Sequence, residues 1–288
     1  MSAVYKRELR AYMNNVYGYL FMAVLLLFVG AMVFYWNLGY GSPDIQYSLV
    51  YGEYVLLLMI PVLCMRSMAE DKRNKTDMFY LSLPMKTSSV VLGKYFALLT
   101  VYAIPCLVIC CYPLLLGFFG KVNYLSSYVS VLTFFLLGAA LIAVCQFMSA
   151  LTENLVVAAV LGVASTVILY FLPFLGFVVP DTGLASYIGF VVLALVAAGI
   201  AFLTTHNLNV TAITGAALVL PLSVLYIILR DRFAGVLTAV LEYVSPFLHF
   251  QEIINYSIFS VPSVLLLLSY PVFFLFLTVQ AADKKRWD

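Results

Sequence analysis

Charged side chains are scarce in this sequence. Only 10% of its 288 residues are Asp, Glu, Lys or Arg, and 65% are hydrophobic, whereas about 25% of the residues of a soluble domain are charged. The composition therefore excludes an ordinary soluble globular protein and indicates insertion into a membrane. The formal net charge of +2 is too small to attract a polyanion, so we expect no nucleic acid partner.

The sequence also lacks the motifs of catalysis. No Gly-x-x-x-x-Gly-Lys-[Ser/Thr] loop is present, because neither Gly93-Lys94 nor Gly120-Lys121 is followed by Ser or Thr. The chain therefore has no such loop to bind the phosphates of ATP. His-Glu-x-x-His and Gly-x-Ser-x-Gly are absent as well, so we predict no catalytic residue and no enzyme activity.

Metal and disulfide sites are not expected either. The five cysteines lie within apolar runs, away from the polar loops in which an extracellular disulfide framework is built, and we predict free thiols. His249 and Glu252 have helical spacing, but Glu242 is the only other candidate ligand nearby. Because zinc requires three or four ligands, a polar pair is the better interpretation.

Long hydrophobic runs are what the sequence has in abundance. A hydrocarbon core of about 30 Å requires about 20 helical residues, and a helix satisfies its own backbone in lipid. We predict an all-α polytopic helical bundle, one transmembrane domain over residues 1–288, with about eight crossings, or six if one neighbouring pair is re-entrant. The runs are 16–36, 48–65, 95–119, 125–151, 155–179, 184–205, 208–229 and 260–280.

Basic residues are distributed unequally between the predicted loops. Twelve of the fifteen lie in the N-terminal segment, the loop 66–94 and the C-terminal tail, whereas the opposite loops contain only Lys121, Arg230 and Arg232. Since Lys and Arg in short loops stay in the cytoplasm, both termini and the loop 66–94 are predicted to be cytoplasmic.

One charged residue, among Asp, Glu, Lys and Arg, interrupts the eight runs. Glu53 lies in the second run, and we expect it to be alone and peripheral, near the outer end of its helix. Ion-coupled carriers bind the coupling ion at ionisable groups within the bundle. Ion coupling is therefore poorly supported, and energy for transport should come from outside the chain.

Two segments outside the runs have amphipathic character. Residues 2–15 alternate basic and apolar side chains at helical spacing and predict a helix in the headgroup layer, although basic residues before a span also act simply as a topology signal. Residues 230–259 predict two short extracellular helices, re-entrant or capping, separated at Ser245-Pro246.

The loop 66–94 is the most informative segment. Its first half is densely charged, an aromatic and aliphatic cluster follows, and Pro84 ends it. A short charged helix with an exposed apolar end suits docking into a groove of a soluble partner. The alternative is that Phe79 and Tyr80 pack against lipid headgroups, as interfacial aromatics do.

Three segments together resemble a known family. They are YKRELRAYMNNVYGYLF (5–21), MRSMAEDKRNKTDMFYLSLPMKTSSVVLGKY (65–95) and FLHFQEIINYSIFSVPSVLLLLSYPVFFLFLTVQAADKKRW (247–287). In this order they are similar to the membrane subunit of type-2 ABC exporters of the gliding-motility-type bacterial branch. The chain departs from the family's pattern at Asn74-Lys75, where many members have Gly, and at Phe79-Tyr80, where Leu-Leu is usual.

The resemblance implies a permease in the bacterial plasma membrane that pairs with two copies of an ABC ATPase, which bind ATP and Mg. It implies no cofactor in this chain, a second permease copy as homodimer or heterodimer, contact with membrane lipid, and room for an auxiliary membrane or extracytoplasmic subunit. Residues 69–83 would form a coupling helix on the ATPase. The implied docking residues are Glu70, Asp71, Arg73, Thr76, Asp77, Phe79, Tyr80 and Leu83.

Two other functions stay open at this point. The first is an ion-coupled secondary transporter or channel, which would work without an ATPase. The second is a non-transporting membrane anchor subunit. The sequence does not identify the cargo, although its 43 Tyr and Phe residues suit an apolar or amphiphilic substrate.

Overall fold

The computed structural model describes residues 1–76, 86–178, 180, 182–205, 208–228, 233–256 and 260–284. Helices are the only regular elements in these ranges, which confirms the predicted all-α class. The chain divides into two compact units, residues 1–169 with 249–288 and residues 170–248. The boundaries fall inside α9 (Leu155–Val178) and α13 (Pro246–Tyr256).

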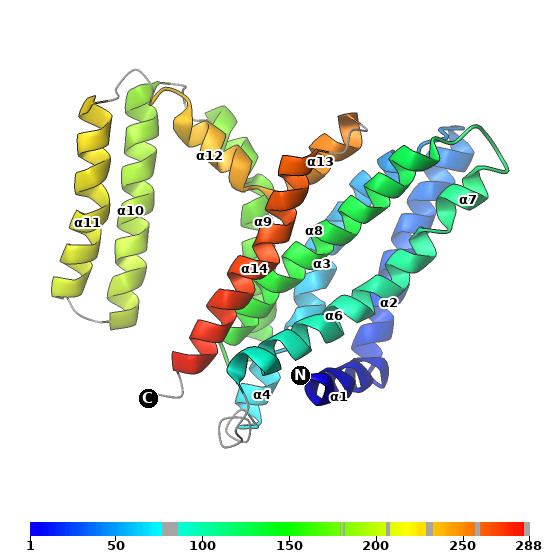
Figure 1. Cartoon of the computed structure of the whole chain (residues 1–288), viewed down its shortest axis with the longest axis horizontal. Coiled ribbons are helices and arrows are strands. Elements are labelled where there is room, and N and C mark those ends of the chain that lie inside the picture. Colours follow the sequence, from blue (N-terminus) through cyan, green and yellow to red (C-terminus); the bar gives the residue numbers. More distant parts are fainter. Residues whose placement is uncertain are drawn as a thin grey trace. The chain divides into compact units, whose positions relative to one another are not determined.

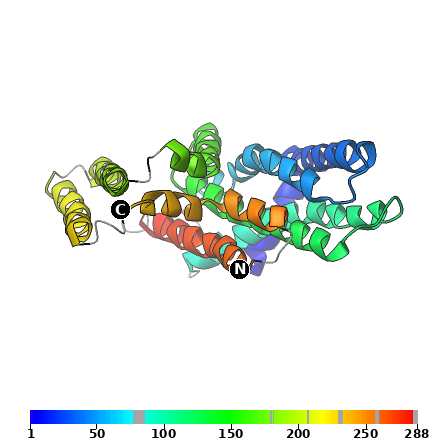
Figure 2. The ribbon, with the colours of Figure 1, turned by 90° about the horizontal axis from the view of Figure 1, so that it is seen from above.

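The first unit contains most of the long helices (Figure 1). In Figure 2, α2 lies beside α3, which it also contacts. The elements other than α9 and α13 are α1 (Ser2–Met13), α2 (Val16–Met32), the π-helix η1 (Val33–Gly39), α3 (Gln46–Cys64), α4 (Ala69–Arg73), α6 (Thr87–Ile109), α7 (Tyr112–Leu116), α8 (Tyr124–Ala150) and α14 (Val261–Lys284).

Helix α8 is at the centre of this unit, and α3, α6 and α14 all pack against it. Its middle is a series of small buried residues, from Gly138 to Ala140. A Cβ atom at Gly138 would lie 2.2 Å from the ring of Tyr102 on α6, so glycine is required for this close approach. Small residues allow membrane helices to pack closely in the absence of a hydrophobic driving force.

Six helices in the described ranges are long and apolar enough to cross a membrane, as a polytopic membrane protein requires. Helices also occupy 184–205 and 208–228 in the two other predicted crossings, where the apolar helical stretches among the described residues are 183–195 and 215–227. The number of crossings beyond six therefore stays a prediction.

The second unit contains α10 (Gly183–Thr205), α11 (Leu208–Ile228) and α12 (Val236–Val244). Helices α10 and α11 lie side by side as a hairpin (Figure 1). Their packing includes stacked Tyr187 and Tyr226 rings with centroids 4.6 Å apart. Helices α12 and α13 meet at Ser245-Pro246, where the sequence predicts a break in the segment 230–259.

Glu53 differs from its expected place. It is fully buried on α3, and its Oε1 accepts a hydrogen bond of 2.6 Å from Nε2 of Gln251 on α13. The expectation of a peripheral residue is wrong because a short helix almost 200 positions later in the chain covers it. His249 and Glu252, also on α13, form the predicted polar pair at 3.2 Å.

Candidate functional site

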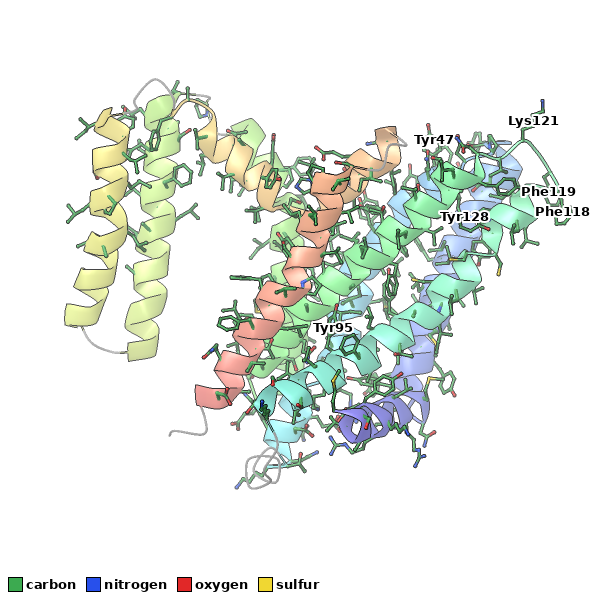
Figure 3. All side chains as sticks on the ribbon, viewed as in Figure 1. Tyr47, Tyr95, Phe118, Phe119, Lys121 and Tyr128 are labelled. Atoms are coloured by element: carbon green, nitrogen blue, oxygen red, sulfur yellow. The ribbon has the colours of Figure 1, made fainter. Side chains whose placement is uncertain are left out.

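Charged residues gather at one end of the first unit. We call this the charged end, and it comprises α1, α4, the first turns of α6 and the last turn of α14 (Figure 1). The Thr87 hydroxyl on α6 donates a hydrogen bond of 2.5 Å to Oδ1 of Asp283 on α14, which joins two of these elements. Figure 3 shows Phe118, Phe119 and Lys121 at the opposite end.

Helix α1 packs across α6 through a stripe of every fourth residue. Val4, Glu8 and Tyr12 are its buried side chains, as one face of a helix requires. At Gly93 of α6 a Cβ atom would lie 3.2 Å from the Val4 side chain, so glycine keeps the two helices close. Burial raises the pKa of Tyr12 well above its ordinary value, and its phenol therefore stays neutral.

Lys94 joins α1, α4 and α6 through its buried ammonium group. Its side chain is 3% exposed, and Nζ lies 2.6 Å from Oδ2 of Asp71 and 3.3 Å from Oε1 of Glu8. Nζ also donates a hydrogen bond of 2.5 Å to the carbonyl oxygen of Ser67. Arg7 contacts both carboxylates from the more exposed side, at 3.8 Å from Asp71. The buried Glu8 and the partly buried Asp71 are thus paired with one buried and one exposed cation.

Helix α4 is attached to the end of α8 by side-chain bonds. The Ser149 hydroxyl accepts hydrogen bonds from the backbone N–H groups of Met68 (3.2 Å) and Ala69 (3.1 Å), and it donates one to the Met65 carbonyl. The Lys72 ammonium donates to the Ala150 carbonyl. Because a five-residue helix cannot satisfy its first N–H groups itself, Ser149 caps it from another helix.

The turn after α4 has an unusual backbone. Lys75 has φ = 54°, the left-handed conformation that costs a non-glycine residue about 1–2 kcal/mol. Thr76 closes the turn with hydrogen bonds to the carbonyl and to Oδ1 of Asp71. A left-handed residue just after a helix is a common helix end, which gives a physical reason for the glycine that the resembled family has here.

Half of the predicted docking residues lie in the described part of the chain. Glu70 forms a bidentate pair with Arg66 (2.9 and 2.6 Å), Asp71 binds Lys94, and Thr76 bonds Asp71. Arg73 is exposed. The others, Asp77, Phe79, Tyr80 and Leu83, fall outside the described residues.

An open groove of about 270 Å³ lies between α1, the start of α2, Arg66 and the α4 region. The Arg66 guanidinium borders it and stands 5.0 Å from the centroid of the Tyr17 ring. Both oxygens of Glu70 bond Arg66, and Asp71 bonds Lys94, so the charges around the groove are paired within the chain. The groove therefore offers no unpaired charge that would bind a small charged ligand.

Sequence reasoning missed Glu8, Lys94 and Ser149 as parts of this site. A signal for two of them was present: Glu8 occupies the same helical stripe as Val4 and Tyr12, and Lys94 is the only charged residue of α6. An acid and a base on buried helix faces are expected to pair with each other. Ser149 had no such signal, since a polar residue near a helix end is common.

Comparison with known proteins agrees with this architecture. Residues 6–230 match the family described as ABC-2 family transporter protein. No curated protein matches the sequence. The match covers more than half of the chain and includes most of α1 and all of α4 and α6. It leaves the gliding-motility branch a prediction. The chain therefore belongs to the ABC-2 transporter family, as a multi-pass membrane protein of the permease type that in bacteria resides in the inner membrane.

Proposed function

We propose that this chain is the permease subunit of an ATP-driven exporter, and that a separate ABC ATPase binds it at α4 and the following residues of the loop 66–94. Two ATPase copies would bind and hydrolyse ATP with Mg, and two permease copies would form the path for the cargo. The chain itself would not hydrolyse ATP.

The buried Lys94 network is the observation that supports this proposal most. Force applied to α4 reaches α6 through the Asp71–Lys94 pair and α1 through Glu8. It reaches α8 through Ser149 and Lys72. A loop that merely connects two spans does not need bonds to three other elements, whereas a lever moved by a partner does.

The exposed side of α4 favours a macromolecular partner. Arg73, Asn74 and Lys75 are exposed, while Glu70 and Asp71 turn inward to their partners in the chain. The outer side of α4 is therefore basic, and the apolar residues around Phe79 follow it in sequence. A basic rim next to an aromatic anchor is a common composition for a protein interface.

Co-purification with an ABC ATPase tests this function. We expect Phe79→Asp to lower the amount of ATPase that co-purifies with the tagged chain by about tenfold or more, because losing an aromatic anchor costs about 2 kcal/mol or more. ATP turnover of the assembly should fall in parallel. Phe119→Asp is the matched control, because Phe119 is 77% exposed at the opposite end of the unit.

The same preparation distinguishes the alternatives. Equal ATPase recovery with Phe79→Asp and Phe119→Asp would contradict docking at this loop. Uptake into vesicles driven by an ion gradient, without any ATPase, would support the secondary transporter or channel. A stable assembly that transports nothing with ATP would support the anchor subunit.

A further inference from the structure

Glu53 is a buried acid that the coupling function does not use. It lies seven residues after the start of α3, at the end of the unit opposite the charged end. At 1.5 Å per residue this places it about 10 Å inside the helix. Its exposed fraction is 0%, so the carboxyl group has no contact with solvent in this arrangement.

The two oxygens of this carboxyl group have different surroundings. Oε1 accepts a hydrogen bond of 2.6 Å from the Gln251 amide. Oε2 is buried and has no hydrogen-bond partner among the described residues. An ionised carboxylate in such a place costs several kcal/mol unless a cation or further donors compensate it.

No such compensation is found in the described surroundings. Apart from α13, the helices that contact α3, namely α2, η1, α8 and α9, contain no Asp, Glu, Lys, Arg or His. Asp44 precedes α3 by two residues and lies nine residues from Glu53. On α13, His249 lies 3.2 Å from both the Ser263 hydroxyl on α14 and the Glu252 carboxylate on α13.

We propose that Glu53 is a proton-binding site and that its bound proton holds α13 against α3. The proton would stand on Oε2, which leaves Oε1 free to accept the Gln251 N–H. No covalent bond other than O–H forms or breaks. A proton is the ligand that fits, because it neutralises the carboxyl group without requiring a cavity for an ion.

The proposal links this contact to proton release. When α13 separates from α3, water reaches Glu53 and the carboxyl group loses its proton at neutral pH, as an exposed glutamate does. The closed contact therefore takes up one proton and the open state releases it. By linkage, rising pH above the ordinary carboxyl range favours the open state, and acid favours the closed one.

Packing around Gln251 makes this contact specific. The neighbouring Phe250 is fully buried, and its ring lies 6.0 Å from the ring of Phe134 on α8. Ile253 and Ile254 are buried as well. The apolar residues of α13 thus hold the helix in the core of the first unit, and the Gln251–Glu53 hydrogen bond is the polar contact that responds to protonation.

Infrared spectroscopy of the whole purified chain in lipid vesicles tests this site directly. We expect the carbonyl band of a protonated carboxyl group near neutral pH, absent in Glu53→Gln and still present in Glu153→Gln, which removes an exposed acid from the loop before α9. Gln251→Leu should shift the same band to higher frequency, because Oε1 loses its hydrogen bond. A neutral-pH spectrum of the wild type without this band would overturn the proposal.

Thermal unfolding of the same samples gives a second readout. The Tm of the wild type should fall by about 2–4 °C as the pH rises from acid to neutral, relative to Glu53→Gln, because about 1 kcal/mol corresponds to that shift in a chain of this size. Identical pH profiles for the two chains would overturn the proposal. A Tm that rises with added Na⁺ or K⁺ at fixed pH in the wild type but not in Glu53→Gln would also overturn it, because the ligand would then be a metal cation.

Discussion

The hydrogen-bond donors of Lys94 match the acceptors around it in number. Its ammonium group has three N–H donors, and three acceptors surround it, one each from Ser67, Asp71 and Glu8. Arginine, with a planar fork of five donors, could not meet the same three acceptors within this space. A buried charge of this kind contributes little net stability when complete, but removing one partner leaves the others uncompensated.

Replacing this lysine should therefore be costly. We expect Lys94→Met to destabilise the chain by about 3–5 kcal/mol, because the buried Glu8 and the partly buried Asp71 would be left without their main cation. Thermal unfolding in detergent measures the effect. Lys86→Met is the control, since Lys86 is an exposed lysine at the start of the same helix. Equal Tm values for the two variants would show that the carboxylates find another partner.

At the scale of elements, α4 depends on its neighbours. It has five residues, and isolated helices shorter than about 12 residues are marginal in water. Buried Ala69 and the bonds from Ser149 and Lys72 hold it on α8. A short element attached in this way moves as part of the bundle rather than independently, as the proposed lever requires.

The cap supplied by Ser149 can be removed selectively. In Ser149→Ala the N–H groups of Met68 and Ala69 lose their acceptor, which should cost about 1–2 kcal/mol locally. We expect faster hydrogen exchange in residues 66–76 and little change elsewhere. Ser269→Ala is the control, because its exposed hydroxyl bonds only a carbonyl of its own helix. Unchanged exchange in residues 66–76 would mean that Lys72 and Ala69 suffice to hold α4.

The elements themselves were largely predictable, and their contacts were not. Hydrophobic length predicts the spans, because a membrane helix must satisfy its own backbone. The hydropathy of the second span gives no information on which later segment covers Glu53, since Gln251 is 198 positions away. The Ser245-Pro246 break was predictable because proline ends a helix locally. The pairing of Lys94 with Glu8 was not, because it depends on the packing of α1 across α6.

For the whole molecule, the charged end has a consequence for orientation. Most of the basic residues belong to α1, the loop 66–94 and the C-terminal tail, and in the first unit α1 and α4 lie at the end opposite Lys121 (Figures 1 and 3). Cytoplasmic placement of the charged end is what the distribution of Lys and Arg predicts. It is also what the proposed ATPase requires, because ATP is in the cytoplasm.

Accessibility of single cysteines in intact cells tests this orientation. We expect Lys121→Cys to react with a membrane-impermeant maleimide added outside, and Lys75→Cys to react only after the membrane is opened. The parent chain carries Cys110→Ser and Cys111→Ser, since Cys64, Cys106 and Cys145 are buried. Both substituted lysines are in exposed positions, so a difference in labelling reports their side of the membrane. The reverse pattern would place α4 outside and exclude a cytoplasmic ATPase as its partner.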